Sequence, residues 1–166
     1  MARCARFGHA ALCSAEEFWQ AKSMNATEVH RLVACVQALA TERDDFRAVA
    51  ICGSWARGDP GPASDLDVLI IAKDPKSLHC NQEWMKDLQF DDAGFRYVGH
   101  ETATYGAVWS AHIDLEPHAA LELTFAERCW ASIDPIDPGT REVVTDAFQI
   151  LVDKDSVLQR LRDACS

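Results

Sequence analysis

Apolar residues recur at helical spacing in the first third of the chain. They stand three or four positions apart: Val29, Leu32, Val33, Val36, Leu39 and Ala40. This spacing places them on one face of an α-helix. The pattern therefore predicts an amphipathic helix after Thr27 that buries one face.

Three other segments carry helix signals. The run Ser-Ala-Glu-Glu at residues 14–17 has the form of a capping box and predicts a short helix. Residues 81–88 have a weaker helical pattern. Near the other end, Asp155 is positioned to cap a final helix with apolar positions in residues 157–161.

Short apolar runs bounded by turn residues predict the strands. Residues 46–52 and 66–72 have the length and composition of two buried strands. Residues 105–115 and 120–126 predict two half-buried strands joined by a tight turn, and residues 148–152 predict a last strand.

The predicted order is helix, strand, strand, helix, hairpin, strand and helix. This order predicts an α/β or α+β sandwich in which helices cover a mixed sheet. Turn-forming residues at 59–62 and 134–139 predict loops. No linker rich in Gly, Ser or Pro divides the chain. We therefore expect one compact unit, with residues 1–45 as an N-terminal helical segment and residues 46–166 as the principal domain.

Charge argues against one class of partner. The 166 residues include 16 Lys and Arg against 26 Asp and Glu, a net charge of −10 at pH 7. Residues 1–52 hold six residues of each sign, so residues 53–166 carry the whole acidic excess. An acidic body repels the phosphate backbone, so we expect no nucleic-acid partner. The same excess suits a site that concentrates cations.

The apolar runs and the cysteines indicate where in the cell the protein is expected. The longest clean apolar run, residues 68–72, is far shorter than the roughly 18 residues of a membrane span. The seven cysteines form no C-x-x-C pair, and their odd number does not suit a disulfide framework. These features predict a cytoplasmic protein without a membrane partner.

The segment that leaves the first buried strand has the composition of a phosphate cradle. A strand that ends at Gly53-Ser54 and turns into a helix exposes backbone N–H groups at the positive end of the helix dipole. Gly53 lets the backbone approach an oxygen closely. The Ser54 hydroxyl can donate to that oxygen, and Arg57, one turn later, can add a charge-assisted contact.

Ten residues separate Ser54 from two carboxylates at the start of the second buried strand. In the run Ser64-Asp65-Leu66-Asp67, the aspartates stand two positions apart. Alternate residues of a strand share a face, so both carboxylates are expected on one side, about 6.6 Å apart at Cα. Such a pair can share divalent cations, and Mg²⁺ prefers a few carboxylates together with phosphate oxygens.

Gly-Ser, ten residues and Asp-x-Asp form the signature of the nucleotidyltransferase superfamily of DNA polymerase beta. The segments GSWARG and SDLDVLI resemble its small bacterial members, which are minimal nucleotidyltransferases and the catalytic domain of aminoglycoside nucleotidyltransferases. The resemblance implies a palm-like fold, a nucleoside triphosphate substrate and two Mg²⁺ ions, with Mn²⁺ as the alternative metal. The residues it implies for nucleotide phosphates are Gly53, Ser54, Arg57 and Ser64, and those it implies for metal are Asp65 and Asp67.

The family also uses a third carboxylate on a neighbouring strand, which completes a metal site and helps to deprotonate the attacking hydroxyl. Glu122 alternates with leucines on a predicted strand, where an unpaired carboxylate in the core would be costly. Asp114 alternates in the same way on the preceding strand. Glu122 is favoured as the third metal-binding and catalytic residue, with Asp114 as the alternative.

The remaining histidines are interpreted as surface or hydrogen-bonded residues, and the tryptophans as core residues. The histidines without metal-ligand spacing are His79, His100, His112 and His118. The tryptophans expected in the core are Trp84, Trp109 and Trp130.

Together these features predict Mg²⁺-dependent transfer of a nucleoside monophosphate from a nucleoside triphosphate to a hydroxyl acceptor, with release of pyrophosphate. The acceptor is a small molecule such as an aminoglycoside, or a side chain of a partner protein. A homodimer or that partner could supply the rest of the acceptor pocket. The alternative is a catalytically impaired nucleotide-binding or protein-interaction module of the same fold.

Overall fold

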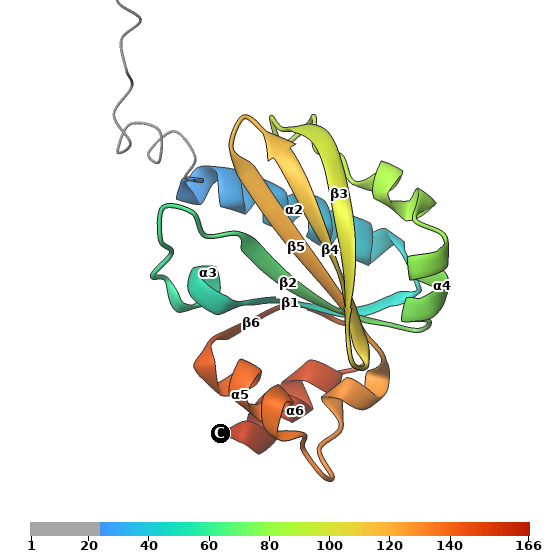
Figure 1. The fold of residues 1–166 in the computed structure, drawn as a ribbon. Helices are drawn as coiled ribbons and strands as arrows, with labels where there is room; N and C mark the ends of the chain where they lie inside the picture. Colours follow the sequence, from blue (N-terminus) through green and yellow to red (C-terminus); the bar gives the residue numbers. More distant parts are fainter. Residues whose placement is uncertain (1–23) are drawn as a thin grey trace, which may run out of the picture.

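Six strands form one mixed sheet in the computed structural model, which describes residues 24–166 (Figure 1). The strands are β1 Phe46–Cys52, β2 Leu66–Ala72, β3 Arg96–Tyr105, β4 Val108–Glu116, β5 Ala119–Ala126 and β6 Phe148–Asp153. Their order across the sheet is β3-β4-β5-β2-β1-β6. β2 and β5 run parallel, and every other neighbouring pair is antiparallel. The predicted mixed sheet is therefore confirmed.

Helices cover both faces of the sheet. They are α2 Ala26–Glu42, α3 Gly53–Arg57, α4 Pro75–Cys80, α5 Pro138–Asp146 and α6 Val157–Cys165, with 3₁₀ turns at Glu83–Asp87 and Arg128–Ala131. The long helix α2 crosses one face, whereas α5 and α6 lie together against the other (Figure 1). The chain is thus a sandwich of helices around a central mixed sheet, as predicted.

The apolar runs of β1 and β2 supply two separate cores because alternate residues point to opposite faces. Val49 and Ile70 pack on the α2 side, together with the buried face of that helix. Ala50 and Ile71 pack on the other side against the buried leucines of α6. Since both faces of these strands are buried, the sequence there is continuously apolar rather than alternating.

The second face of the sheet is covered over only part of its width. α5 and α6 pack near β1, β2 and β6, and their core ends at Leu69, Ile71 and Ala126. Farther across the same face, β4 and β5 present polar residues that are partly or fully exposed. This open polar half, beside the C-terminal helices, is where the candidate site lies.

β3, α4 and α5 were not predicted. The sequence placed a helix at residues 81–88, but α4 lies before it at Pro75–Cys80, and the predicted segment contains only the 3₁₀ turn Glu83–Asp87. β3 was missed because it is an edge strand with mostly exposed residues, and so it lacks an alternating apolar pattern. α5 was missed because residues 134–139 were expected to form only a loop. The loop in fact ends in a helix start, since Asp137 accepts a hydrogen bond from the Thr140 N–H and Pro138 occupies the first turn.

The start of α6 differs from the prediction. The helix begins at Val157 as expected, but Asp155 does not cap it, because its carboxylate pairs with Arg47. Asp153 accepts from the Val157 and Gln159 N–H groups instead, both at 2.9 Å. The first predicted helix, at residues 14–17, lies outside the described residues. No helix within residues 24–166 has the length and apolar character to cross a membrane.

Candidate active site

Gly53 forms the corner between β1 and α3. Its φ of +67° lies in the left-handed region, which glycine adopts without the steric cost of a Cβ. A Cβ at this position would stand 2.7 Å from Oδ2 of Asp67. Glycine is therefore required twice, once by the backbone turn and once by the close approach of the Asp67 carboxylate.

Ser54 follows at the start of α3. The cap residue Cys52 makes no side-chain hydrogen bond to the first turn of this helix. Within the described residues, the Ser54 hydroxyl likewise has no hydrogen-bond partner. Donors at this corner therefore remain for an incoming oxygen.

A row of functional groups crosses the open polar face from strand to strand. Asp67 on β2 is the cross-strand partner of Glu122 on β5, which is in turn the partner of His112 on β4. Nε2 of His112 lies 3.4 Å from Oε2 of Glu122. Asp65 directly precedes β2, and Leu66 between the two aspartates is fully buried. The structure thus brings Asp65, Asp67 and Glu122 together.

Burial and neighbouring carboxylates raise the pKa of both aspartates of this site. Burial raises the pKa of Asp67 to about 6, and the charges of Glu122 and Asp65 contribute to the rise while His112 opposes it. Burial also raises the pKa of Asp65, His112 opposes that rise, and Glu122 and Asp114 add to it. The site therefore concentrates negative charge without a matching cation, which favours binding of a positively charged ligand.

A cavity of about 380 Å³ lies over this row. Gly53, Asp67 and Glu122 line one part of it, and Trp130 and Val143 line another. We call it the carboxylate cavity. A larger hollow of about 660 Å³, lined in part by Tyr97 and His100, contains none of the predicted site residues. In register, those two residues share the sheet face of the buried Leu115 and Ile113, opposite the carboxylates.

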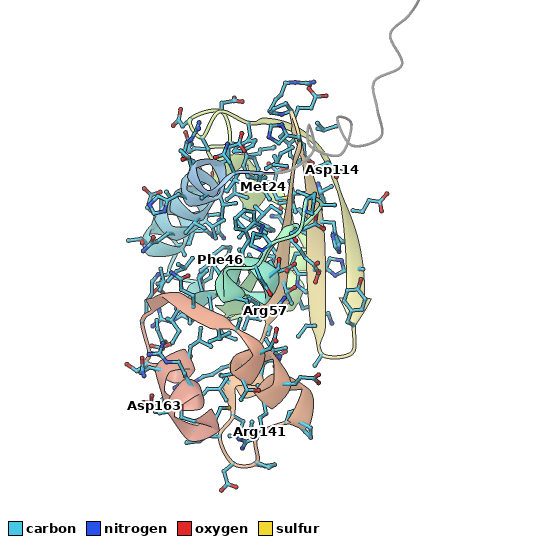
Figure 2. All side chains as sticks on the ribbon, turned by 90° about the vertical axis from the view of Figure 1, so that its left-hand side faces the viewer. Met24, Phe46, Arg57, Asp114, Arg141 and Asp163 are labelled. Carbon is cyan, nitrogen blue, oxygen red and sulfur yellow. The ribbon has the colours of Figure 1, made fainter. Side chains whose placement is uncertain are left out.

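Arg57 and Ser64 have protein partners of their own. The Arg57 guanidinium pairs with Asp59 at 2.9 Å and also with Asp146 of α5. Figure 2 shows Arg57 close to the C-terminal helices. The Ser64 hydroxyl accepts a hydrogen bond from the Gly61 N–H at 2.8 Å. An incoming phosphate would therefore have to compete with Asp146 for Arg57.

The two candidates for the third carboxylate are clearly separated. Glu122 is half-buried and lies directly beside Asp67. Asp114 is exposed and pairs with Ala120, so β5 stands between it and β2. It also lies toward the end of the strands that is distant from the C-terminal helices (Figure 2). Of the two, only Glu122 is therefore a direct neighbour of Asp67.

Sequence reasoning missed two residues at this site. His112 was interpreted as a surface or hydrogen-bonded residue outside the site, although it shares the face of Asp114 by simple alternation along β4, a signal that could have placed it. Trp130 was assigned to the core, and it does pack against the core around α6, but it is also partly exposed and lines the carboxylate cavity. Trp84 and Trp109 are buried, as predicted.

Cys52 also lines the cavity, but burial raises the pKa of its thiol to about 12, so it is not a ready nucleophile.

The donor set suits a hard divalent cation. Asp65, Asp67 and Glu122 offer only oxygen ligands, and neither aspartate takes part in an ion pair within residues 24–166. No group of three His, Cys, Asp or Glu side chains in this part of the chain already converges as a ligand set. Mg²⁺ is commonly held by one or two carboxylates plus substrate phosphates. The residues therefore fit a cation that binds together with a phosphorylated substrate.

Comparison with known proteins identifies a family. A family model described as a nucleotidyltransferase domain matches residues 36–123, which include the Gly53 corner and all three carboxylates. Comparison with curated proteins found no match. A crystal structure of an aminoglycoside 6-adenyltransferase from Bacillus subtilis is similar at a TM-score of 0.49 and 13% identity, over 75% of this chain and 40% of that chain. The chain thus spans less than half the length of that protein.

Proposed function

The chain belongs to the nucleotidyltransferase domain family, and from this premise we propose that it transfers a nucleoside monophosphate from a nucleoside triphosphate to an acceptor hydroxyl. The observation that carries the proposal is the juxtaposition of Asp67 and Glu122 with the Gly53 corner. Charged oxygens that attract cations and N–H groups that attract phosphate thus meet at one cavity.

Asp65 and Asp67 are the residues proposed to hold two Mg²⁺ ions, or Mn²⁺ in their place. When bound, such a metal pair neutralises charge on the transferred phosphate and activates the attacking oxygen. Burial, and after it the charges of Glu122 and Asp65, raises the pKa of Asp67 to about 6. These crowded acidic groups support the assignment, because a bound cation would stabilise their ionised forms.

The remaining residues position the substrate and handle the proton. Gly53 and Ser54 would hold the β- and γ-phosphates through N–H and hydroxyl donors. The acceptor oxygen forms a bond to the α-phosphorus, the bond from that phosphorus to the bridging oxygen of the β-phosphate breaks, and pyrophosphate leaves. Glu122 accepts the proton from the acceptor hydroxyl. Arg57 would stabilise the departing pyrophosphate once it releases Asp146.

The acceptor is proposed to be cationic. Glu101, Asp114 and Glu122 lie on the open polar face, either in the row of Asp67 or near it. A surface of this charge attracts a polyamine-like small molecule such as an aminoglycoside, or a basic protein surface, and repels nucleic acid.

Pyrophosphate release tests the proposal against its alternative, a nucleotide-binding module without turnover. The protein would be titrated with MgATP, and then incubated with MgATP and a panel of aminoglycosides and basic proteins. Binding together with acceptor-dependent release of pyrophosphate would support an enzyme. Binding without release from any acceptor would favour the impaired module, and a folded protein that binds no nucleoside triphosphate would contradict both.

The third carboxylate can be identified by a matched pair of neutral variants. We expect Glu122→Gln to lower the rate of pyrophosphate release by about 10²-fold or more, because a general base contributes on this scale. Asp114→Asn removes one charge from the same face and should leave the rate within about threefold, since only long-range repulsion changes. Steady-state rates at saturating MgATP would measure both effects. Equal losses in the two variants would contradict the assignment of Glu122.

A further inference from the structure

A second hollow adjoins the carboxylate cavity. Its volume is about 710 Å³, and it shares Val108, Trp130 and Val143 with the carboxylate cavity. We call it the Trp130 cavity. Because three residues line both spaces, the second hollow directly adjoins the cavity that contains Asp67.

Trp130 differs from the other described tryptophans. The indole N–H groups of Trp55, Trp84 and Trp109 each donate to a backbone carbonyl, whereas that of Trp130 has no acceptor among residues 24–166. Its ring is also partly exposed, although Trp84 and Trp109 are almost completely buried. Trp130 packs in part against the core around α6, and the rest of its ring, with an unused donor, lines both cavities.

The lining of the Trp130 cavity is unsuited to phosphate. Apolar groups of Ala107, Val108, Pro135 and Val143 form much of it, and no cationic side chain is among its described lining residues. Of its two carboxylates, that of Asp137 is already engaged with the Thr140 N–H, and the other belongs to the exposed Glu127. A flat, uncharged and aromatic ligand fits this composition better than an anion does.

The strand register gives the distance between the carboxylates and the Trp130 cavity. Glu122 and Thr124 of β5 both line the carboxylate cavity, and Thr124 is the cross-strand partner of Ser110, two residues from Val108 on β4. Val108 is thus about four residue positions from Glu122 along the strands, or roughly 13 Å at 3.3 Å per residue. This length suits a ribose and base that extend from an α-phosphate beside Asp67.

We propose that the Trp130 cavity binds the nucleobase of the nucleoside triphosphate, which stacks on the Trp130 indole. The inference rests on the proposed function, because it assumes that the phosphates lie at the Gly53 corner. With the base in the Trp130 cavity, the open acidic face of β4 and β5 remains for the acceptor, on the other side of the row formed by Asp67, Glu122 and His112. The nucleotide and its cationic acceptor would then approach the α-phosphate from different directions.

Binding of two magnesium complexes tests the inference. MgATP carries a base and magnesium tripolyphosphate does not, so calorimetric titration of both separates base contacts from phosphate contacts. We expect Trp130→Ala to weaken MgATP binding by about tenfold or more, the scale of one base–aromatic stack, and to leave tripolyphosphate binding within twofold. Trp130→Phe should restore most of the loss. Tyr97→Ala removes an exposed aromatic outside both cavities and should change neither affinity.

A measurement on the unmodified chain makes the test independent of whether Trp130→Ala folds. In nitrogen-15-labelled protein, the indole N–H resonance of Trp130, identified by its absence in Trp130→Phe, should shift with MgATP and not with tripolyphosphate. An unchanged resonance in the presence of bound MgATP would overturn the inference alone, as would equal weakening of both ligands by Trp130→Ala. Failure of the wild type to bind either ligand would overturn the proposed function and this inference together.

Discussion

Replacing Asp67 with asparagine is expected to abolish nucleotidyl transfer and, at neutral pH, to stabilise the folded protein. The activity should fall by about three orders of magnitude or more, because the amide lacks the negative charge with which a carboxylate holds a catalytic cation. The free energy of unfolding should rise at neutral pH. Asp67 is half-buried beside Glu122 and Asp65, so its ionised form is disfavoured in the folded protein.

The sign of the stability effect follows from the pKa of Asp67, which is about 6 in the folded protein against an ordinary value of 3.8. The folded state therefore binds this proton more tightly than the unfolded state. The contribution of Asp67 to stability is fully present below pH 4 and is lost as the pH rises through about 6. Two pKa units correspond to about 3 kcal/mol, an upper limit for a group that keeps some solvent contact.

We expect Asp67→Asn to raise the free energy of unfolding by about 1–3 kcal/mol at pH 7 and by much less at pH 4. Denaturant titrations at both pH values, in buffer free of divalent cations, would measure the difference. Asp114→Asn is the matched control, because it removes an exposed carboxylate from the same face. A variant that loses stability at pH 7 would show that Asp67 supports the fold rather than straining it.

Gly53→Ala should impair both folding and function more than any other glycine-to-alanine change at a turn of this domain. The left-handed φ of +67° costs a residue with a Cβ about 1–2 kcal/mol. The new methyl group would in addition stand 2.7 Å from Oδ2 of Asp67, so the carboxylate would have to move. Displacement of a catalytic group by about 1 Å costs roughly 10²-fold in rate.

Gly58→Ala separates these two effects. Gly58 has a φ of +80°, yet a Cβ there would meet nothing within 4 Å. Both variants should therefore lose similar stability from backbone strain, whereas only Gly53→Ala should lose MgATP affinity and turnover. Thermal unfolding and nucleotide titration would be compared for the pair. Equal turnover in the two variants would indicate that the contact between Gly53 and Asp67 has no role in the site.

A helix or strand of this protein could be predicted from the sequence where its own residues determine it, and could not where a distant segment does. β1 and β2 were predicted with their observed bounds because both are buried on two faces, and continuous apolar runs record that burial directly. β3 is an edge strand bonded only to β4, so its existence depends on a partner strand rather than on its own composition. α5 depends on a cap at Asp137 that is also typical of an isolated turn.

Some residues of the candidate site are likewise recorded in the local sequence, and others depend on a distant strand. Gly53, Ser54, Asp65 and Asp67 lie within one short segment, and the alternation of side chains along a strand places the two aspartates together before any tertiary contact is known. For the third carboxylate beside these aspartates, the sequence left both Glu122 and Asp114 as candidates. Only the parallel pairing of β2 with β5 makes Glu122 the neighbour of Asp67 and leaves Asp114 beyond the next strand.

The sequence by itself determined the strand cores, the turn at Gly53, the paired aspartates and the acidic charge of the chain, because local spacing and composition carry each of them. Tertiary structure alone decided the contact of Glu122 with His112, the pairing of Arg57 with Asp146 and the exposure of Trp130. The physical reason is separation along the chain. These contacts join residues that only sheet register and helix packing bring together, and no local periodicity records which distant strand or helix will be the neighbour.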